Sequence, residues 1–131
     1  YLSNAYTCLE LIDDRNASYD KLDPYSLIAD NAWSSGVILG EKIVDWKNLD
    51  LNQLNSKLFW NDKIISEAKL NNSNPINSLL WIIKHLGKYN KILRKGSIII
   101  TGSIFRTKKP NLGDKIKFEV ENNSHVSTQI T

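Results

Sequence analysis

Hydrophobic periodicity confines long helical structure to a small part of this 131-residue chain. The clearest helix is predicted to begin at Asn74-Pro75, because proline suits the first helical position and apolar residues then recur at helical spacing. Those residues are Ile76, Leu79, Leu80, Ile83 and Leu86. Most other apolar runs are short and rich in β-branched residues, which is typical of strands. The sequence therefore predicts an α+β fold with more strand than helix.

A second helix is predicted over residues 25–39, because Asp23 suits an N-cap and Pro24 the first helical position. Asn61-Asp62 lies between two strand-like runs and favours a hairpin turn, although the usual glycine is absent. The β-branched run at 97–101 is typical of a buried strand. The other strands are expected at residues 8–12, 42–46, 51–60, 63–68, 115–120 and 126–130.

The length of the chain fits a single domain over residues 1–131. No apolar run approaches the roughly 20 residues of a membrane helix, so no membrane partner is expected. Cys8 is the only cysteine, which excludes an internal disulfide and a multi-cysteine zinc site. A lone cysteine agrees with a reducing compartment, and we expect a cytoplasmic protein.

Charge is distributed unevenly along the chain, although the net charge is only +3. Residues 70–113 contain no Asp or Glu. The cations of that segment are Lys84, Lys88, Lys91, Arg94, Lys95, Arg106, Lys108 and Lys109. Such a segment suits nucleic acid, small anionic substrates or plain solvation. Aromatic residues are not interleaved with these cations as a single-strand binding groove requires, so no nucleic-acid partner is expected.

A carboxylate stands at the centre of the apolar stretch CLELIDDR, residues 8–15. As a strand, this stretch places Cys8, Glu10 and Ile12 on one face and the two leucines on the other. Either Glu10 faces water, or it is buried with a partner that offsets its desolvation, and a metal ion is one such partner.

Two further stretches are candidate sites. Asn31, Ser34 and Ser35 have i, i+3, i+4 spacing, which predicts one polar helical face next to Asp30. Residues 101–103, Thr-Gly-Ser, end an apolar run in a small turn that a ligand could approach closely. Capping and turn roles account for such residues equally well. Nucleophilic catalysis has little support, because neither histidine lies in a recognisable constellation.

Read in order, four stretches resemble the C-terminal half of the 2-keto-4-pentenoate hydratase family, which includes 2-oxo-acid decarboxylases and belongs to the fumarylacetoacetate hydrolase superfamily. They are CLELIDDR, IADNAWSSGVILG, NPINSLLWIIKHLGKY, and GSIIITGSIF followed by LGDKIKFEVE. The resemblance implies a mixed β-sandwich roll that binds Mg²⁺ or Mn²⁺ through three acidic side chains. Glu10 matches the third ligand, which implies that it faces inward toward the ion.

The resemblance also implies the substrate site. Asp30, Asn31, Ser34 and Ser35 match residues beside the metal. Thr101, Gly102 and Ser103 match the turn that receives the substrate carboxylate. The implied substrate is a small anionic 2-oxo or 2-hydroxy-dienoic acid, and the implied setting is a cytoplasmic homo-oligomer of aromatic catabolism.

Two parts of the family pattern are expected upstream of Tyr1: the Glu-x-Glu pair that supplies two ligands, and the lysine and aspartate for proton transfer. The catalytic residues are therefore unknown within this chain. Its only Glu-x-Glu, residues 119–121, matches a different part of the pattern. Trp33 enlarges the segment before the serines, and Asp14 replaces the usual small residue before Arg15.

The resemblance favours a hydratase that adds water to a 2-hydroxy-2,4-dienoate to give a 4-hydroxy-2-oxo acid. A 4-oxalocrotonate-type decarboxylase and a truncated, non-catalytic binding or assembly module remain alternatives. If this is half of a closed fold, we expect an exposed apolar surface where the other half or a second subunit packs.

Overall fold

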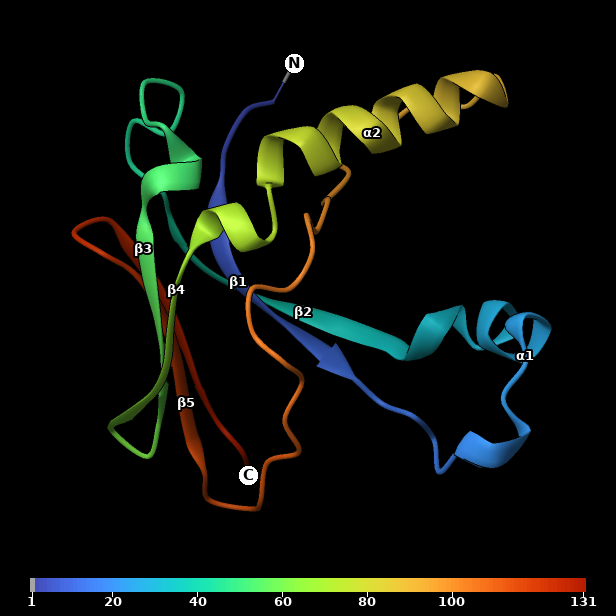
Figure 1. The fold of residues 1–131 in the computed structure, drawn as a ribbon, viewed down its shortest axis with the longest axis horizontal. Helices are drawn as coiled ribbons and strands as arrows, with labels where there is room; N and C mark the ends of the chain where they lie inside the picture. The colour runs from blue at the N-terminus through green and yellow to red at the C-terminus, as the bar shows by residue number, and fades with distance from the viewer. Residues whose placement is uncertain (1) are drawn as a thin grey trace.

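The computed structural model describes residues 2–131 as an α+β fold with two antiparallel sheets (Figure 1). The smaller sheet pairs β1 (Tyr6–Ile12) with β2 (Ser34–Lys42). The larger sheet has the order β4-β3-β5-β6. Its strands are β3 (Asn55–Trp60), β4 (Lys63–Lys69), β5 (Lys115–Val120) and β6 (Ser124–Gln129). The α-helices are α1 (Pro24–Ala29) and α2 (Pro75–Lys88). The expected α+β class is confirmed.

The hairpin between β3 and β4 turns at Asn61-Asp62 as predicted. Both residues have left-handed backbones, with φ of 50° and 64°. That conformation is required at both central positions of a type I′ turn, and Asn and Asp tolerate it better than most residues. Asn61 is held further by its amide NH₂, which donates to Asp114 Oδ1 at 2.8 Å.

The predicted helix over 25–39 is wrong beyond Ala29. Asp23 does cap α1, accepting from Tyr25 N and Ser26 N, and Pro24 opens the helix. The chain then makes a short 3-10 turn at Asn31–Trp33 and enters β2 at Ser34. The apparent helical spacing was overridden by pairing with β1, which packs Ile38 against the core.

The strand predicted over 42–46 is also wrong, since β2 already ends at Lys42. The Ile43 amide donates to the Ala5 carbonyl at 2.9 Å, but the Val44 amide donates to the Asn123 side chain at 2.8 Å. Asp45 then takes a left-handed backbone, with φ of 53°, and turns the chain away.

Helix α2 begins at Asn74-Pro75 as predicted, but it is poorly covered. Leu79 is its buried residue, whereas several apolar side chains of the helix are exposed. They are Ile76, Leu80, Trp81 and Ile83. In Figure 1 the helix projects from the two sheets toward its C-terminal end. The expected exposed apolar surface is present on this helix.

The strand predicted over 97–101 is wrong. These residues form no helix or strand, and the Ile98 side chain is 63% exposed. A β-branched run becomes a strand only beside a neighbour that pairs with its backbone, and no strand of residues 2–131 pairs with this one. Further along, Ile104 and Phe105 pack against the core.

The hydrophobic core lies between the two sheets. Its buried members are Leu58, Leu70, Phe118, Val120 and Val126, with Leu9 and Ile38 of the small sheet packed against them. The two sheets are joined by the buried Thr7 and Ser124 hydroxyls, which lie 3.0 Å apart. Ser124 Oγ donates to the Glu41 carbonyl at 2.8 Å, so the Thr7 hydroxyl donates to Ser124. The face of β1 that carries Thr7 and Leu9 is therefore the one that packs on the core.

No helix within residues 2–131 combines the length and the apolar character needed to cross a membrane.

Candidate functional site

The pairing of β1 with β2 brings two of the three candidate stretches together. Glu10 lies opposite Val37, and Ile12 lies opposite Ser34. Directly opposed residues point to the same side of a sheet and alternate along each strand. Val37 therefore shares the face of Glu10, while Leu9 and Ile38 share the face that packs on the core. The register shift between Leu11 and Ile12 pairs Ser34 with Ile12 and leaves Ser35 without a directly opposed residue.

Glu10 does not face inward within this chain. The predicted alternation along CLELI holds, but Glu10 lies on the side opposite the core and is exposed. Its neighbours on that face include Cys8, whose thiol pKa is raised by burial and by the Glu10 charge. The inward orientation implied by the family resemblance is corrected here. Core packing of Leu9 leaves the alternate side chain on the open side.

The stretch Asp30–Ser35 does not form one polar helical face. Asn31, Ala32 and Trp33 all have left-handed backbones, with φ of 50°, 48° and 63°, and the serines that follow belong to β2. Consecutive left-handed residues that are not glycine are strained, so surrounding contacts must stabilise them. Ser34 then pairs with Ile12, and Ser35 lies at a register shift in the pairing of β2 with β1.

An ion pair missed by the sequence interpretation lies beside this left-handed turn. Arg15 Nη1 donates to Asp30 Oδ1 at 2.7 Å and to the Asp30 carbonyl at 3.4 Å. The Asp13 amide donates to the Trp33 carbonyl at 3.0 Å. Asp30 is thus engaged by Arg15, at the end of the stretch that carries Glu10. The arginine of CLELIDDR and the aspartate of IADN carry opposite charges, and this was the sequence feature from which the ion pair could have been predicted.

Tyr19 packs against the same turn. Its ring meets the Trp33 ring edge-on, with centroids 5.5 Å apart. Its hydroxyl donates to Asp14 Oδ2 at 2.7 Å. That hydrogen bond lowers the pKa of Asp14 and raises the pKa of Tyr19. Asp14, which departs from the family pattern, therefore has a structural role beside Trp33, the other departure.

The third stretch, Thr101-Gly102-Ser103, lies on the irregular segment that follows α2. Gly102 has φ of +105°, a conformation that favours glycine, and a Cβ there would lie 3.9 Å from Ser73 Cβ. Ser103 Oγ donates to the Phe105 carbonyl at 2.5 Å. Among residues 2–131, no hydrogen bond or ion pair joins this turn to Glu10 or to the Asn31–Ser35 stretch.

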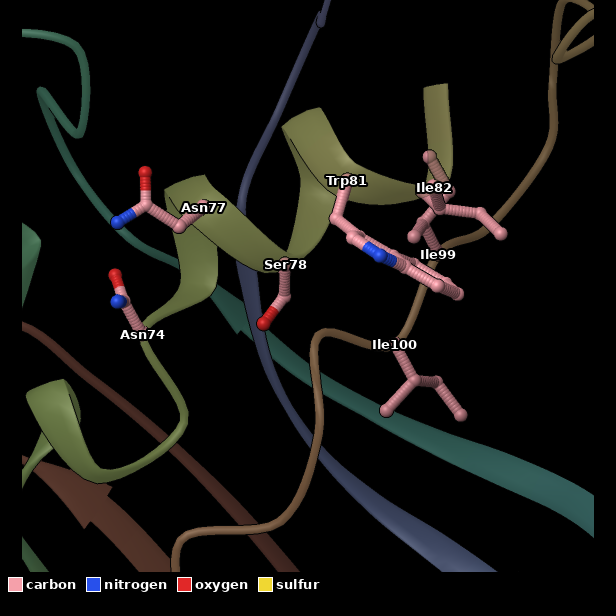
Figure 2. A pocket seen from close by; sticks show the side chains of 7 residues that line it. All are labelled: Asn74, Asn77, Ser78, Trp81, Ile82, Ile99 and Ile100. Atoms are coloured by element: carbon pink, nitrogen blue, oxygen red, sulfur yellow. The ribbon is translucent and has the colours of Figure 1, made fainter. Parts of the chain in front are cut away.

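A shallow groove of about 480 Å³ lies beside this turn, between the start of α2 and the irregular segment (Figure 2). It is lined by Asn74, Asn77, Ser78, Trp81, Ile82, Ile99 and Ile100. Asn74 has a left-handed backbone, and its Oδ1 is buried without a hydrogen-bond partner among the described residues. The sequence interpretation took these residues only as parts of a helix and a strand.

The residues present do not form a complete divalent-metal site. Within the described part of the chain, no three His, Cys, Asp or Glu side chains gather closely enough to hold an ion. A magnesium site needs several oxygen ligands in near-octahedral geometry. Glu10 supplies one carboxylate, and it belongs to no such group of three among residues 2–131.

The sequence was compared with those of known proteins. No family model matches the sequence. The 2-oxo-hept-4-ene-1,7-dioate hydratase of Escherichia coli is 31% identical over 128 residues, covering 91% of this chain and 47% of that protein. A 2-keto-4-pentenoate hydratase of Paraburkholderia phymatum is 28% identical over 102 residues, covering 76% of this chain and 38% of the relative.

The fold agrees with these relatives. A solved structure of 4-oxalocrotonate decarboxylase from Pseudomonas putida G7, complexed with magnesium and adipate, matches with a TM-score of 0.79. It is 26% identical, and the match covers 95% of this chain and 48% of the decarboxylase. The chain is thus similar in sequence and in fold to proteins of the 2-keto-4-pentenoate hydratase family over most of its length.

The family resemblance inferred from the four stretches is thereby confirmed, and the hydratase and decarboxylase relatives both fall within the fumarylacetoacetate hydrolase superfamily. The chain spans about half the length of the curated family members it matches.

Proposed function

We propose that this chain supplies one half, the C-terminal one, of a family hydratase that adds water to a 2-hydroxy-2,4-dienoate to give a 4-hydroxy-2-oxo acid. The observation that carries the proposal is the 31% identity to a hydratase over nearly the whole chain. The β1–β2 register supports it, because it brings Ser34, opposite Ile12, to the end of the strand that carries Glu10. The remaining half would complete the β-sandwich roll.

Glu10 is proposed as one carboxylate ligand of a divalent ion, Mg²⁺ or Mn²⁺. The solved decarboxylase structures are complexed with magnesium or with calcium, and carboxylate oxygen suits such hard cations. The other ligands and the proton-transfer groups would come from the half of the family fold that this chain does not match. The exposure of Glu10 supports this, because an exposed carboxylate is accessible to a second surface.

The proposed substrate contacts come from two places. Asn31, Ser34 and Ser35 would offer polar groups beside Glu10, and Thr101, Gly102 and Ser103 would receive the substrate carboxylate. Asp30 is proposed to position the turn rather than to contact substrate, because Arg15 already engages it. The exposed cations of residues 84–109 would attract a small anionic substrate. A homo-oligomer in the cytoplasm, acting in aromatic catabolism, completes the proposal.

A second candidate function is decarboxylation of a 2-oxo acid. It is favoured by the structural match to 4-oxalocrotonate decarboxylase over 95% of this chain. The third candidate, a non-catalytic assembly module, agrees with the lack of a three-ligand cluster among the described residues.

The metal proposal is tested first on the chain alone. We expect calorimetric titration with Mg²⁺ to give weak binding or none, because one carboxylate does not offset the dehydration of this ion. Tight, stoichiometric binding that Glu10→Gln abolishes would show a complete site within these 131 residues. Glu67→Gln, a change of an exposed β4 carboxylate, is the matched control.

Activity is tested in a hybrid in which residues 1–131 replace the matching 47% of the Escherichia coli hydratase. We expect turnover of a 2-hydroxy-2,4-dienoate, loss of metal affinity in Glu10→Gln, and unchanged metal affinity in Ser103→Ala. Ser103→Ala should reduce turnover or binding roughly ten- to a hundredfold, since a hydrogen bond to a charged group contributes about 1.5–3 kcal/mol.

A folded hybrid that releases CO₂ from a 2-oxo acid without hydrating the dienoate would favour the decarboxylase. A folded hybrid without either activity would favour the non-catalytic module.

A further inference from the structure

The segment of residues 98–105 forms no helix or strand, and its backbone has no backbone hydrogen bond within residues 2–131. The hydrogen bond that Ser103 Oγ donates to the Phe105 carbonyl is its one polar contact in that range. Five of these eight residues are nevertheless half-buried: Ile99, Ile100, Thr101, Ile104 and Phe105. Backbone N–H and C=O groups that leave water need partners, so this segment is incomplete as it stands.

The side chains of the segment are those of a strand. Residues 98–101 read Ile-Ile-Ile-Thr, and β-branched residues of this kind fit a pleated, half-buried surface. The composition of this segment predicts a strand, but no second strand within residues 2–131 pairs with it. An unpaired segment of this composition can accept a strand from another polypeptide.

An uncovered apolar surface borders the same segment. Trp81 of α2 lines the groove together with Ile99 and Ile100 (Figure 2), and its side chain is 62% exposed. Ile98, at the start of the segment, is 63% exposed. A strand added at residues 98–101 would therefore lie next to apolar surface that it also covers. The unpaired backbone and the exposed apolar side chains therefore lie at the same place in the fold.

We propose that residues 98–101 are a strand-addition site, and that its occupant is an extended strand from the half of the family fold that this chain does not match. The inference rests on the proposed function only for the choice of partner. Pairing there would order the Thr101–Ser103 turn directly after the new strand. It would thus connect completion of the fold with completion of the proposed substrate site.

Charge favours this occupant over a second copy of the chain. Residues 70–113 have no acidic side chain, and the cations from Lys84 to Lys109 in this region are exposed. Two copies paired along this segment would bring like charges together, which is unfavourable. The expected partner strand is apolar at alternate positions and carries acidic residues at or near its ends.

Amide hydrogen exchange tests the proposal in two proteins: the full 131-residue chain, and the hybrid in which it replaces the matching part of the Escherichia coli hydratase. We expect the amides of residues 98–101 to exchange rapidly in the chain alone and roughly tenfold or more slowly in the hybrid. Equal, rapid exchange in both proteins would overturn the proposal. Protection in the chain alone that increases with its concentration would also overturn it, because a second copy would then be the occupant.

Proline substitution separates strand pairing from simple burial. Ile99→Pro removes an amide that has no backbone partner in the chain alone, and it also removes a half-buried side chain in both proteins, so it should lower the thermal midpoint of the hybrid by more than that of the chain. Ile92→Pro, at a nearby exposed isoleucine, is the matched control and should affect neither midpoint. An Ile99→Pro hybrid that melts with the unsubstituted hybrid would overturn the proposal. A protected but inactive hybrid would refute the proposed function alone, and an active but unprotected hybrid would refute the strand addition alone.

Discussion

Gly40 marks the closest approach between the two sheets. A Cβ at this position would lie 2.3 Å from the His125 carbonyl oxygen, 2.5 Å from Val126 Cβ and 2.6 Å from Thr7 Oγ1. A carbonyl of β6 does not move aside as the end of a flexible side chain does. The absence of a side chain at Gly40 therefore allows β2 to cross β6 and sets the position of the Glu10 face.

Gly40→Ala should destabilise the chain by about 1–3 kcal/mol, the usual cost of forcing extra volume into a packed site. Gly87→Ala is the control, because a Cβ there meets nothing within 4 Å and alanine favours the helix by roughly 0.5–1 kcal/mol. Urea unfolding followed by tryptophan fluorescence measures both variants. A Gly40→Ala midpoint equal to that of the unsubstituted chain would contradict the close approach.

At the scale of elements, the joint between α1 and β2 is the most constrained part of the fold. Three successive left-handed residues separate the helix from the strand, and the Arg15–Asp30 ion pair and the Tyr19–Trp33 contact hold them from outside. An exposed ion pair contributes little by itself, typically about 0–1 kcal/mol. Pairing of β2 with β1 is therefore what maintains the left-handed turn.

Ala32→Gly should stabilise the chain by about 0.5–1 kcal/mol. A left-handed backbone costs alanine roughly 1–2 kcal/mol, and glycine avoids that cost while losing some of the gain to greater backbone entropy in the unfolded state. Ala68→Gly in β4 is the matched control and should shift stability the other way. Thermal unfolding compares the two variants, and a destabilised Ala32→Gly would show that this turn is not left-handed.

At the scale of the whole molecule, hydrogen bonding lowers the pKa of several carboxyl groups. The causes are the Tyr19 hydroxyl for Asp14, the Ser26 amide for Asp23, the Asn111 amide for Asp114 and Lys117 for Glu119. A lowered pKa in the folded state means that the unfolded state binds protons more readily in acid. The stabilisation is therefore present above the ordinary carboxyl pKa, about 4, and is lost as pH falls through the lower folded-state values.

Urea midpoints measured between about pH 2.5 and 6 should fall steadily on the acid side, in the range where carboxyl groups titrate. Asp114→Asn should reduce that dependence, because it removes a carboxylate that accepts from the Asn111 amide and the Asn61 side chain. Asp20→Asn, at an exposed carboxyl group, is the control and should retain the acid dependence of the unsubstituted chain. Identical pH profiles for all three proteins would contradict the role given to Asp114.

The sequence alone determined the features that depend on local backbone chemistry and on motif order. Proline at the start of α2, the Asn61-Asp62 turn and the alternation along β5 act within a few residues, and each was predicted correctly. The order of four short stretches was also sufficient to identify the family.

Tertiary structure alone decided the features that depend on a partner distant in sequence. Pairing with β1 turned residues 34–39 from the predicted helix into strand, and packing of Leu9 on the core directed Glu10 outward. The run at 98–101 has every local property of a strand but lacks a neighbour within residues 2–131. The physical reason is the same in each case: a strand is stabilised by hydrogen bonds to another segment, and a sequence pattern does not specify where that segment lies.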